Sequence, residues 1–281
     1  MEDGRSFLPA SCSNMFVDVG ANNGDSLNLW YKRETCAEFT GSGPAGVSKW
    51  PPHRPRKWPC AWMLPSYLSL AVRQTYCSEL FEPNPVHWPA LLRSMEQYAT
   101  SGQRVRVHRK AFATIDDNVE FAIDNQTRNS EGSSMLLSKR LVSPKTGRPG
   151  QGPAMTHRII AKATDGIAFL KRLERIAVTR VVLKLDVEGL EFELLRELLI
   201  SGVLCRVVDD LFIEWHDGRF PWQEAGLPLK ARDISLLYGW MLHYNVTQER
   251  NLVRGNVQRT PLAKAAARHS HHCKTVLFHW S

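Results

Sequence analysis

The stretch FVDVGANNGDS at residues 16–26 decides the fold that this sequence predicts. Its first half is apolar apart from Asp18, which is typical of a parallel strand whose two faces are both covered by helices. Gly20 allows a turn where a side chain would clash, and Gly24 allows a ligand to approach the backbone. Asn22 and the polar residues after it can cap a helix whose first N–H groups point back into the same crevice. The stretch therefore predicts a strand, a turn and a helix that together hold a cofactor.

A second informative stretch, LFEPNP at residues 80–85, has the pattern of a strand that ends on a carboxylate. Its two prolines prevent the strand from continuing past Glu82. An acidic side chain at the tip of a strand beside a glycine turn accepts hydrogen bonds from the two hydroxyls of a ribose. Glu82 is therefore the predicted ribose ligand, with a solvated strand-end carboxylate as the alternative.

The stretch RVVLKLDVEGLE at residues 180–191 predicts a third strand, which turns at Gly189 into a helix. Alternation along the strand puts Lys184, Asp186 and Glu188 on one face. Burial of three charges is costly unless they pair or line a cleft. Two interpretations stay open: an ion pair of Lys184 with Asp186 inside the sheet, or a ligand site at the carboxyl end of a central strand.

The motifs DVGANNGDS, FEPNP and LKLDVEGLE, in this order, resemble the three signatures of the FkbM-type methyltransferase family. Members of that family are S-adenosylmethionine-dependent enzymes with the seven-stranded class I fold, and the resemblance covers about residues 14–216. It implies binding residues for the methionine part, the ribose and the adenine of the cofactor, in this order: Asp18, Gly20, Asn22 and Gly24; Glu82; and Ala111, at the end of an expected strand over 105–108.

The chemistry that follows from this resemblance is attack by an acceptor oxygen or nitrogen on a sulfonium methyl group. The enzyme must align the reacting atoms, and a hydroxyl acceptor must lose its proton. The candidate catalytic residues are Asp186, Glu188 and His216. The intrinsic pKa of His216 suits proton transfer near neutrality, whereas Asp186 has the better position and either takes the proton or orients the acceptor. The polar stretch 125–134 adds weaker candidates for contact with cofactor or acceptor: Asn129, Ser133 and Ser134.

The expected function is methyl transfer, most simply to the oxygen of a sugar, a glycan or another small polar acceptor. A nicotinamide-dependent oxidoreductase and a non-catalytic binding module that keeps the fold are the alternatives. A dinucleotide site needs the pattern Gly-x-Gly-x-x-Gly and an acidic residue about twenty positions further on a strand. Asn22 stands in place of the second glycine, and Glu38 lies on no convincing strand. The sequence therefore favours methyl transfer over hydride transfer.

Length and composition fit one enzyme domain over residues 14–281. The chain has 281 residues, of which 43% are hydrophobic, enough for one large α/β core. Strand and helix patterns alternate, which predicts a single doubly wound, mostly parallel seven-stranded sheet of the Rossmann-like, class I methyltransferase type, whose last two strands form an antiparallel edge. The expected strands are 16–20, 77–82, 105–108, 181–187, 207–214, 240–246 and 275–280.

One segment, residues 39–66, interrupts this pattern. It is dense in glycine, proline and tryptophan, and it falls inside a crossover that needs only a helix and two short loops. We expect a poorly ordered inserted loop. Its role has two interpretations, a lid beside the cofactor crevice or retained intron sequence in the gene model.

The chain carries 36 basic and 28 acidic residues, a net charge of +8, which is compatible with an anionic partner. The positive charge is spread along the chain instead of gathered in one stripe, which argues against nucleic-acid binding. No stretch is apolar enough over a bilayer's thickness, and no leader precedes the first strand. The expectation is a soluble chain, cytoplasmic by default, with its oligomeric state left open.

The six cysteines show no Cys-x-x-Cys spacing, so the sequence predicts neither a zinc site nor a disulfide framework. Reduced thiols are the default expectation, and Cys205 lies among apolar residues typical of a core. The cluster HSHHC at residues 269–273 is interpreted as a polar loop before the last strand. No metal is predicted.

Overall fold

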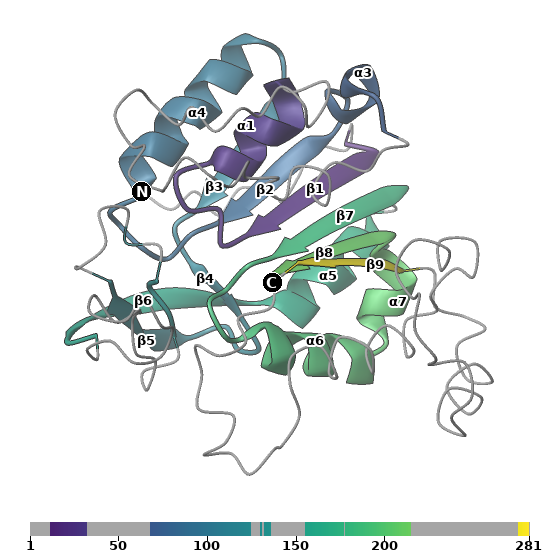
Figure 1. Ribbon diagram of the computed structural model, residues 1–281. Helices are drawn as coiled ribbons and strands as arrows, with labels where there is room; N and C mark the ends of the chain where they lie inside the picture. The colour runs from purple at the N-terminus through teal and green to yellow at the C-terminus, as the bar shows by residue number, and fades with distance from the viewer. Residues whose placement is uncertain are drawn as a thin grey trace, which may run out of the picture.

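The computed structural model describes residues 12–32, 68–124, 130, 132–135, 155–176, 178–214 and 275–280. Within these ranges the protein is a mixed α/β structure built on a parallel six-stranded sheet (Figure 1). The strand order is β3-β2-β1-β7-β8-β9, and every neighbouring pair is parallel. The strands are β1 (Asn14–Val19), β2 (Cys77–Phe81), β3 (Arg104–His108), β7 (Arg180–Leu185), β8 (Asp210–Glu214) and β9 (Val276–Trp280).

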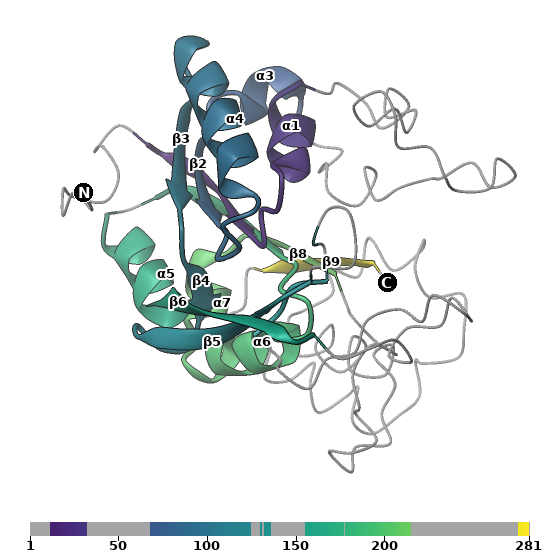
Figure 2. The same cartoon turned by 90° about the vertical axis from the view of Figure 1, so that its left-hand side faces the viewer.

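Helices cover both faces of this sheet (Figure 2). One face carries α1 (Asp25–Lys32), α3 (Leu70–Arg73) and α4 (Trp88–Thr100), and the other carries α5 (Gly166–Arg175), α6 (Glu191–Ile200) and α7 (Val203–Val207). Alternate residues of each strand serve the two layers, because successive side chains point to opposite faces. On β1, Phe16 packs with Trp30 and Leu91 on the α1 side, whereas Val17 packs with Phe169 and Leu195 on the α5 side.

A second, smaller sheet was not predicted from the sequence. It has the order β4-β6-β5, in which β4 (Ala111–Ala113) is parallel and β5 (Asn118–Ile123) antiparallel to β6 (His157–Asp165). Asp165 ends β6 and accepts hydrogen bonds from the backbone N–H groups of residues 167 and 168, which starts α5. Phe112 of β4 contacts Phe81 and Phe169, so the small sheet packs directly beside the tip of β2.

The predicted seven-stranded sheet with an antiparallel edge is not what the structure contains. The described residues form six strands of the large sheet, and the expected strand 240–246 lies outside them. The last strand, β9, is parallel to β8, with Asp210 opposite Val276 and Glu214 opposite Trp280. Two neighbouring strands can be parallel only if the chain between them is long enough to cross back to the start of the sheet. The 61 residues between β8 and β9 are more than enough for such a crossover. The predicted insertion 39–66 lies outside the described residues.

Reduced cysteines were also the wrong expectation. Cys12 and Cys77 form a disulfide with a Cα–Cα distance of 5.9 Å, and Cys205, which packs against the core, is disulfide-bonded too. The register of β1 against β2 explains the first pair: Met15 lies opposite Cys77, so Cys12 enters the sheet beside it. Sixty-five residues separate the two cysteines, so their spacing carried no signal. Because such bonds persist in oxidising environments, the cytoplasmic default loses its support.

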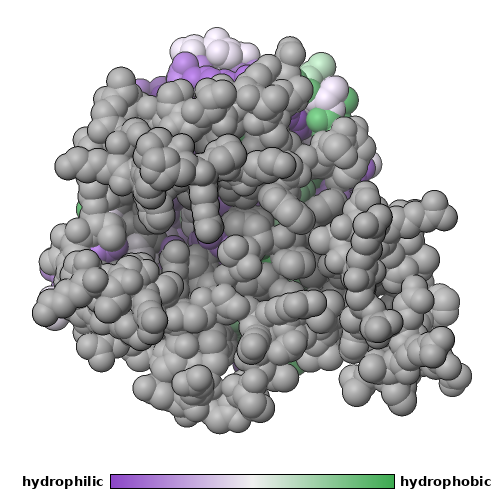
Figure 3. All heavy atoms as spheres, in the orientation of Figure 1, coloured by the Kyte–Doolittle hydropathy of each residue, from purple (hydrophilic) through white to green (hydrophobic). Residues whose placement is uncertain are grey.

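On the face seen in Figure 3, the residues that can be described lie mainly at the top of the molecule. Figure 3 shows hydrophilic side chains over the helices at the top of the molecule, with a small hydrophobic area near α3, where Val72 is 43% exposed. Among the helices that the structure describes, none has the length and apolar character that a membrane crossing requires.

Candidate functional site

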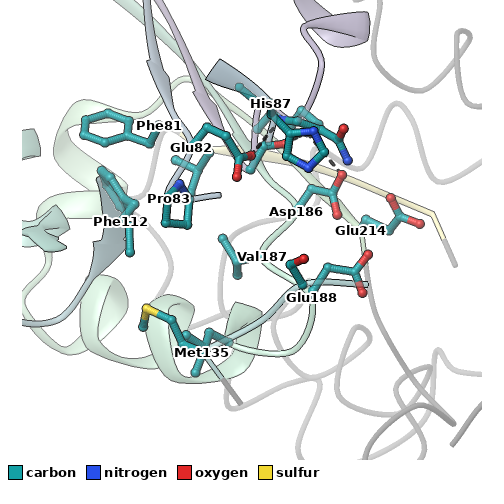
Figure 4. A pocket seen from close by; sticks show the side chains of 18 of the residues that line it. Phe81, Glu82, Pro83, His87, Phe112, Met135, Asp186, Val187, Glu188 and Glu214 are labelled. Carbon is teal, nitrogen blue, oxygen red and sulfur yellow. Dashed lines mark hydrogen bonds and ion pairs between the residues drawn. The ribbon is translucent and has the colours of Figure 1, made fainter. Parts of the chain in front are cut away.

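A pocket of about 230 Å³ opens at the carboxyl ends of β1, β2 and β7. It brings Gly20, Glu82 and Asp186 together from three stretches far apart in the sequence (Figure 4). Parallel neighbouring strands end at the same edge of a sheet, which is where open α/β sheets bind ligands. Of the nine residues predicted for cofactor binding or catalysis, six line this pocket: Gly20, Asn22, Glu82, Ala111, Asp186 and Glu188.

The glycine turn after β1 is held by backbone contacts to both neighbouring strands. The N–H groups of Gly20 and Ala21 donate to the Phe81 carbonyl, both at 3.1 Å. Gly20 has φ +78°, and a Cβ atom on it would lie 1.8 Å from the Asp186 carbonyl oxygen. Gly24 also has positive φ, but its missing Cβ faces Leu91 of α4 at 3.3 Å. Gly24 therefore serves helix packing, whereas the sequence suggested close approach of a ligand.

Beneath the turn, Lys184 joins two carboxylates. Its Nζ lies 3.1 Å from Asp18 Oδ1 and 3.2 Å from Asp186 Oδ2, and it donates to the Gly20 carbonyl at 3.0 Å. Burial alone lowers the pKa of Lys184, but the two carboxylates outweigh it and raise that pKa above its usual value. Asp18 is fully buried and also accepts a hydrogen bond from Ser26. Asp18 thus supports the lysine from below instead of lining the pocket.

Asp186 satisfies both interpretations that the sequence left open. It pairs with Lys184 and also lines the pocket, and its side chain is 23% exposed. The predicted strand 181–187 included Asp186. In the structure β7 ends at Leu185, so Asp186 is the first residue after the strand. Lys184 contacts one oxygen of the Asp186 carboxylate and holds the group with one edge toward the pocket.

Glu82 is buried, with 5% of its surface exposed, which excludes the solvated carboxylate considered above. Its Oε2 accepts a hydrogen bond from the Asn22 N–H at 2.8 Å, and its Oε1 accepts one from the Asn84 N–H at 2.8 Å. Burial raises the pKa of Glu82 to about 7, against the opposing effect of these two hydrogen bonds and of Lys184. The carboxylate is thereby fixed in orientation while its remaining lone pairs face the pocket.

The turn after β7 contains Glu188, which lines the pocket, and is followed by Glu191, which stabilises the turn. Glu191 is fully buried, and its Oε1 accepts from the N–H groups of Val187 and Gly189 at 3.0 and 3.1 Å, which fixes the turn. Glu188 has φ +55°, a left-handed conformation that is costly for a residue with a side chain. Its carbonyl accepts from Ser134 at 2.8 Å, and its side chain points toward the pocket (Figure 4).

The opposite end of the pocket is apolar. Phe112 and Met135 lie there, away from Asp186, Glu188 and Glu214 (Figure 4). Ala111 belongs to this end, but it is the first residue of β4 and does not end β3 as predicted. The pocket thus offers a flat apolar wall at one end and a charged wall at the other.

The structure adds pocket residues that the sequence analysis missed. Glu214 ends β8, so the same rule that selected Glu82 and Asp186 could have selected it. His87 and Ser130 also line the pocket; Ser130 lies within the polar stretch 125–134 that the sequence analysis singled out, whereas nothing in the local sequence pointed to His87. The candidate Ser133 lies in the lining, whereas Ser134 reaches the site through the Glu188 carbonyl.

Two of the candidate site residues, His216 and Asn129, lie outside the described residues. The histidine-rich segment 269–273 lies outside them as well. Over the parts of the chain that can be described, no three His, Cys, Asp or Glu side chains are grouped so as to hold a metal ion.

Comparison with known proteins found no match to a protein-family model, a curated protein or a solved structure. The functional argument therefore rests on the pocket itself.

Proposed function

We propose that this protein is an S-adenosylmethionine-dependent methyltransferase that acts on an oxygen of a sugar, a glycan or another small polar acceptor. The observation that carries the proposal is the charge of the pocket. Its described lining contains five carboxyl groups and a single cation, Lys184, whose charge is shared by two carboxylates. The five are Asp25, Glu82, Asp186, Glu188 and Glu214.

This charge suits a sulfonium cofactor better than a dinucleotide. S-adenosylmethionine has a positive sulfonium and a positive ammonium group, against one carboxylate. A pyrophosphate instead needs N–H groups and a favourable helix dipole. Asp25 occupies the first turn of α1 and lines the pocket, so its negative charge stands where a pyrophosphate is bound in dinucleotide sites.

The residues present fit the parts of the cofactor in the order that the family resemblance implies. Glu82 would accept hydrogen bonds from the ribose hydroxyls, and the wall around Phe112 and Met135 would hold the adenine. The turn at Gly20 and the carboxylate of Asp186 would hold the methionine part. Once bound, the cofactor supplies an activated methyl group.

The chain's own contribution to the transfer is alignment and proton removal. Asp186, Glu188 and Glu214 converge at the charged end of the pocket, where an acceptor hydroxyl would enter (Figure 4). Lys184 contacts one carboxylate oxygen of Asp186 and orients the group, so Asp186 can accept a hydrogen bond from the acceptor and fix its line of attack. His216 remains the second candidate for the base.

Calorimetric titration of the full chain with S-adenosylmethionine, S-adenosylhomocysteine and NAD tests the proposal. We expect both sulfur compounds to bind with one-to-one stoichiometry and NAD to give no heat. Glu82→Ala should weaken binding at least about tenfold, because it removes a charged hydrogen-bond acceptor. Glu174→Ala is the matched control, since Glu174 is exposed, pairs with Arg206 and is not part of the pocket lining.

Binding of NAD in preference to both sulfur compounds would contradict the proposal and support the oxidoreductase alternative. Binding of S-adenosylmethionine without methyl transfer to any member of a broad panel of hydroxyl acceptors would favour the binding module.

A further inference from the structure

His87 lies between the two turns that frame the ribose end of the pocket. It is the residue before α4, is 2% exposed and lines the pocket beside Glu82 (Figure 4). Nothing in the predicted site includes it. His87 contacts both turns, through Asn84 after β2 and through Asn23 after β1.

The contacts of His87 close a ring of hydrogen bonds. The Asn22 N–H donates to Glu82 at 2.8 Å, and the Asn84 N–H donates to the other Glu82 oxygen at 2.8 Å. Asn84 Nδ2 lies 3.2 Å from His87 Nε2, and His87 Nδ1 lies 2.9 Å from Asn23 Oδ1. The peptide bond between Asn22 and Asn23 completes the ring, which joins the glycine turn to the turn after β2.

The hydrogen-bonding partners determine the tautomer of the imidazole. The Asn84 amide is fixed because its Oδ1 accepts from the Val86 N–H at 3.1 Å, while its Nδ2 also donates to Ser133 at 3.1 Å. His87 Nε2 must therefore accept from Asn84, and the Nδ1–H donates to Asn23. Burial lowers the pKa of His87 to about 4, against a smaller opposing effect of the Ser130 backbone, so the ring is neutral near pH 7.

We infer that His87 is a positioning residue that holds the Glu82 carboxylate in the orientation needed to accept two neighbouring hydroxyls of a ribose. It acts through Asn84, whose N–H contacts Glu82, and through Asn23, whose neighbour Asn22 contacts Glu82. The inference rests on the proposed function, because it concerns how the same pocket binds the ribose of S-adenosylmethionine. Removal of the imidazole opens the ring on both sides, whereas protonation of Nε2 breaks only the contact with Asn84.

Two substitutions of His87 separate hydrogen bonding from packing. His87→Phe keeps the ring volume and removes both hydrogen bonds, whereas His87→Gln supplies one donor and one acceptor. With S-adenosylhomocysteine as the probe in calorimetry, we expect His87→Phe to raise Kd about tenfold or more. His87→Gln should stay within about threefold of the unsubstituted protein.

A double-mutant cycle tests whether His87 acts through Glu82. If it does, Glu82→Gln combined with His87→Phe weakens binding by much less than the product of the two single effects. Tyr31→Phe is the stability control: the Tyr31 hydroxyl is buried and bonded to Tyr76 and Ser78, outside the pocket lining. That variant should lower Tm and leave Kd for S-adenosylhomocysteine unchanged.

The outcomes distinguish the two proposals. Failure of the unsubstituted protein to bind S-adenosylhomocysteine overturns the proposed function. Normal binding with an unchanged Kd in His87→Phe, or multiplicative effects in the double variant, overturns the role of His87 alone. Equal weakening by His87→Phe and His87→Gln also overturns it, because the donor and the acceptor that glutamine supplies would then contribute nothing to binding.

Discussion

The two ends of the large sheet are built from different kinds of interaction. At the amino ends of β1 and β2, the Cys12–Cys77 disulfide joins the strands beside a core of apolar side chains. At their carboxyl ends, Asp18, Lys184 and Glu82 are buried around a pocket. Buried charges cost free energy, whereas a cross-link and an apolar core supply it. The comparison indicates that one end stabilises the fold, whereas the other end holds buried charges beside a pocket at a cost in stability.

The largest effect is expected at the charged end. Lys184→Met leaves the Asp18 carboxylate buried without its counter-ion, which should lower the free energy of unfolding by about 4 kcal/mol. Urea denaturation followed by circular dichroism measures this. Lys32→Met is the control, because Lys32 is exposed and its Nζ contacts Gln97. Equal stability of the two variants would show that the buried cluster is not balanced by Lys184.

At the opposite end, the double substitution Cys12→Ala with Cys77→Ala should lower the free energy of unfolding by about 3 kcal/mol, since it frees a loop of 65 residues in the unfolded chain. The Kd for S-adenosylhomocysteine should not change, because both cysteines lie at the far end of the strands. A change in Kd as large as that of Glu82→Ala would break the division between the two ends.

The glycine turn can be tested with a matched pair. Gly20 and Gly102 both have positive φ, but a Cβ on Gly20 meets the Asp186 carbonyl, whereas one on Gly102 meets nothing within 4 Å. Gly102→Ala should cost about 1 kcal/mol for the backbone conformation alone. Gly20→Ala should cost about 2 kcal/mol more, since the clash adds to it, and should abolish binding. Chemical denaturation and calorimetry on the two variants give the comparison, and equal costs would argue against the clash.

The smallest expected effect is a dependence of binding on pH. Because burial raises the pKa of Glu82 to about 7, only the ionised fraction accepts both ribose hydroxyls. The affinity for S-adenosylhomocysteine should rise about tenfold from pH 6 to pH 8, a change that follows from one titrating group. Calorimetry at the two pH values measures it, and Glu82→Gln should show no such rise.

The same shift affects the stability of the ligand-free protein with a definite sign. A carboxyl whose pKa is raised by folding holds its proton longer in the folded state than in the unfolded one. The stabilisation is therefore present below about pH 4.5 and is lost as the pH rises toward about 7. The free energy of unfolding of the unsubstituted protein should fall over that interval relative to Glu82→Gln. A rise instead would mean that Glu82 is not desolvated.

The main strands and the site residues at their tips were predictable from local pattern. β1, β2 and β7 are short strands that are followed by a glycine turn, a proline pair and a charged turn, so their ends were visible in the sequence. The small sheet was not, because β4 has three residues and β5 begins with polar ones, which gives no clear periodicity. His87 was missed because its partners Asn23 and Asn84 lie on turns after two different strands, and these turns become neighbours only when β1 pairs with β2.

The sequence by itself determined where strands end in residues suited to a ligand, because turn chemistry and alternation are local properties of the chain. Only the tertiary structure decided three further features: the Cys12–Cys77 bond, the parallel direction of β9 and the hydrogen-bonded ring around Glu82. All three depend on the register or the direction of strands that are distant in the chain. None of them is encoded in the spacing of residues along the sequence.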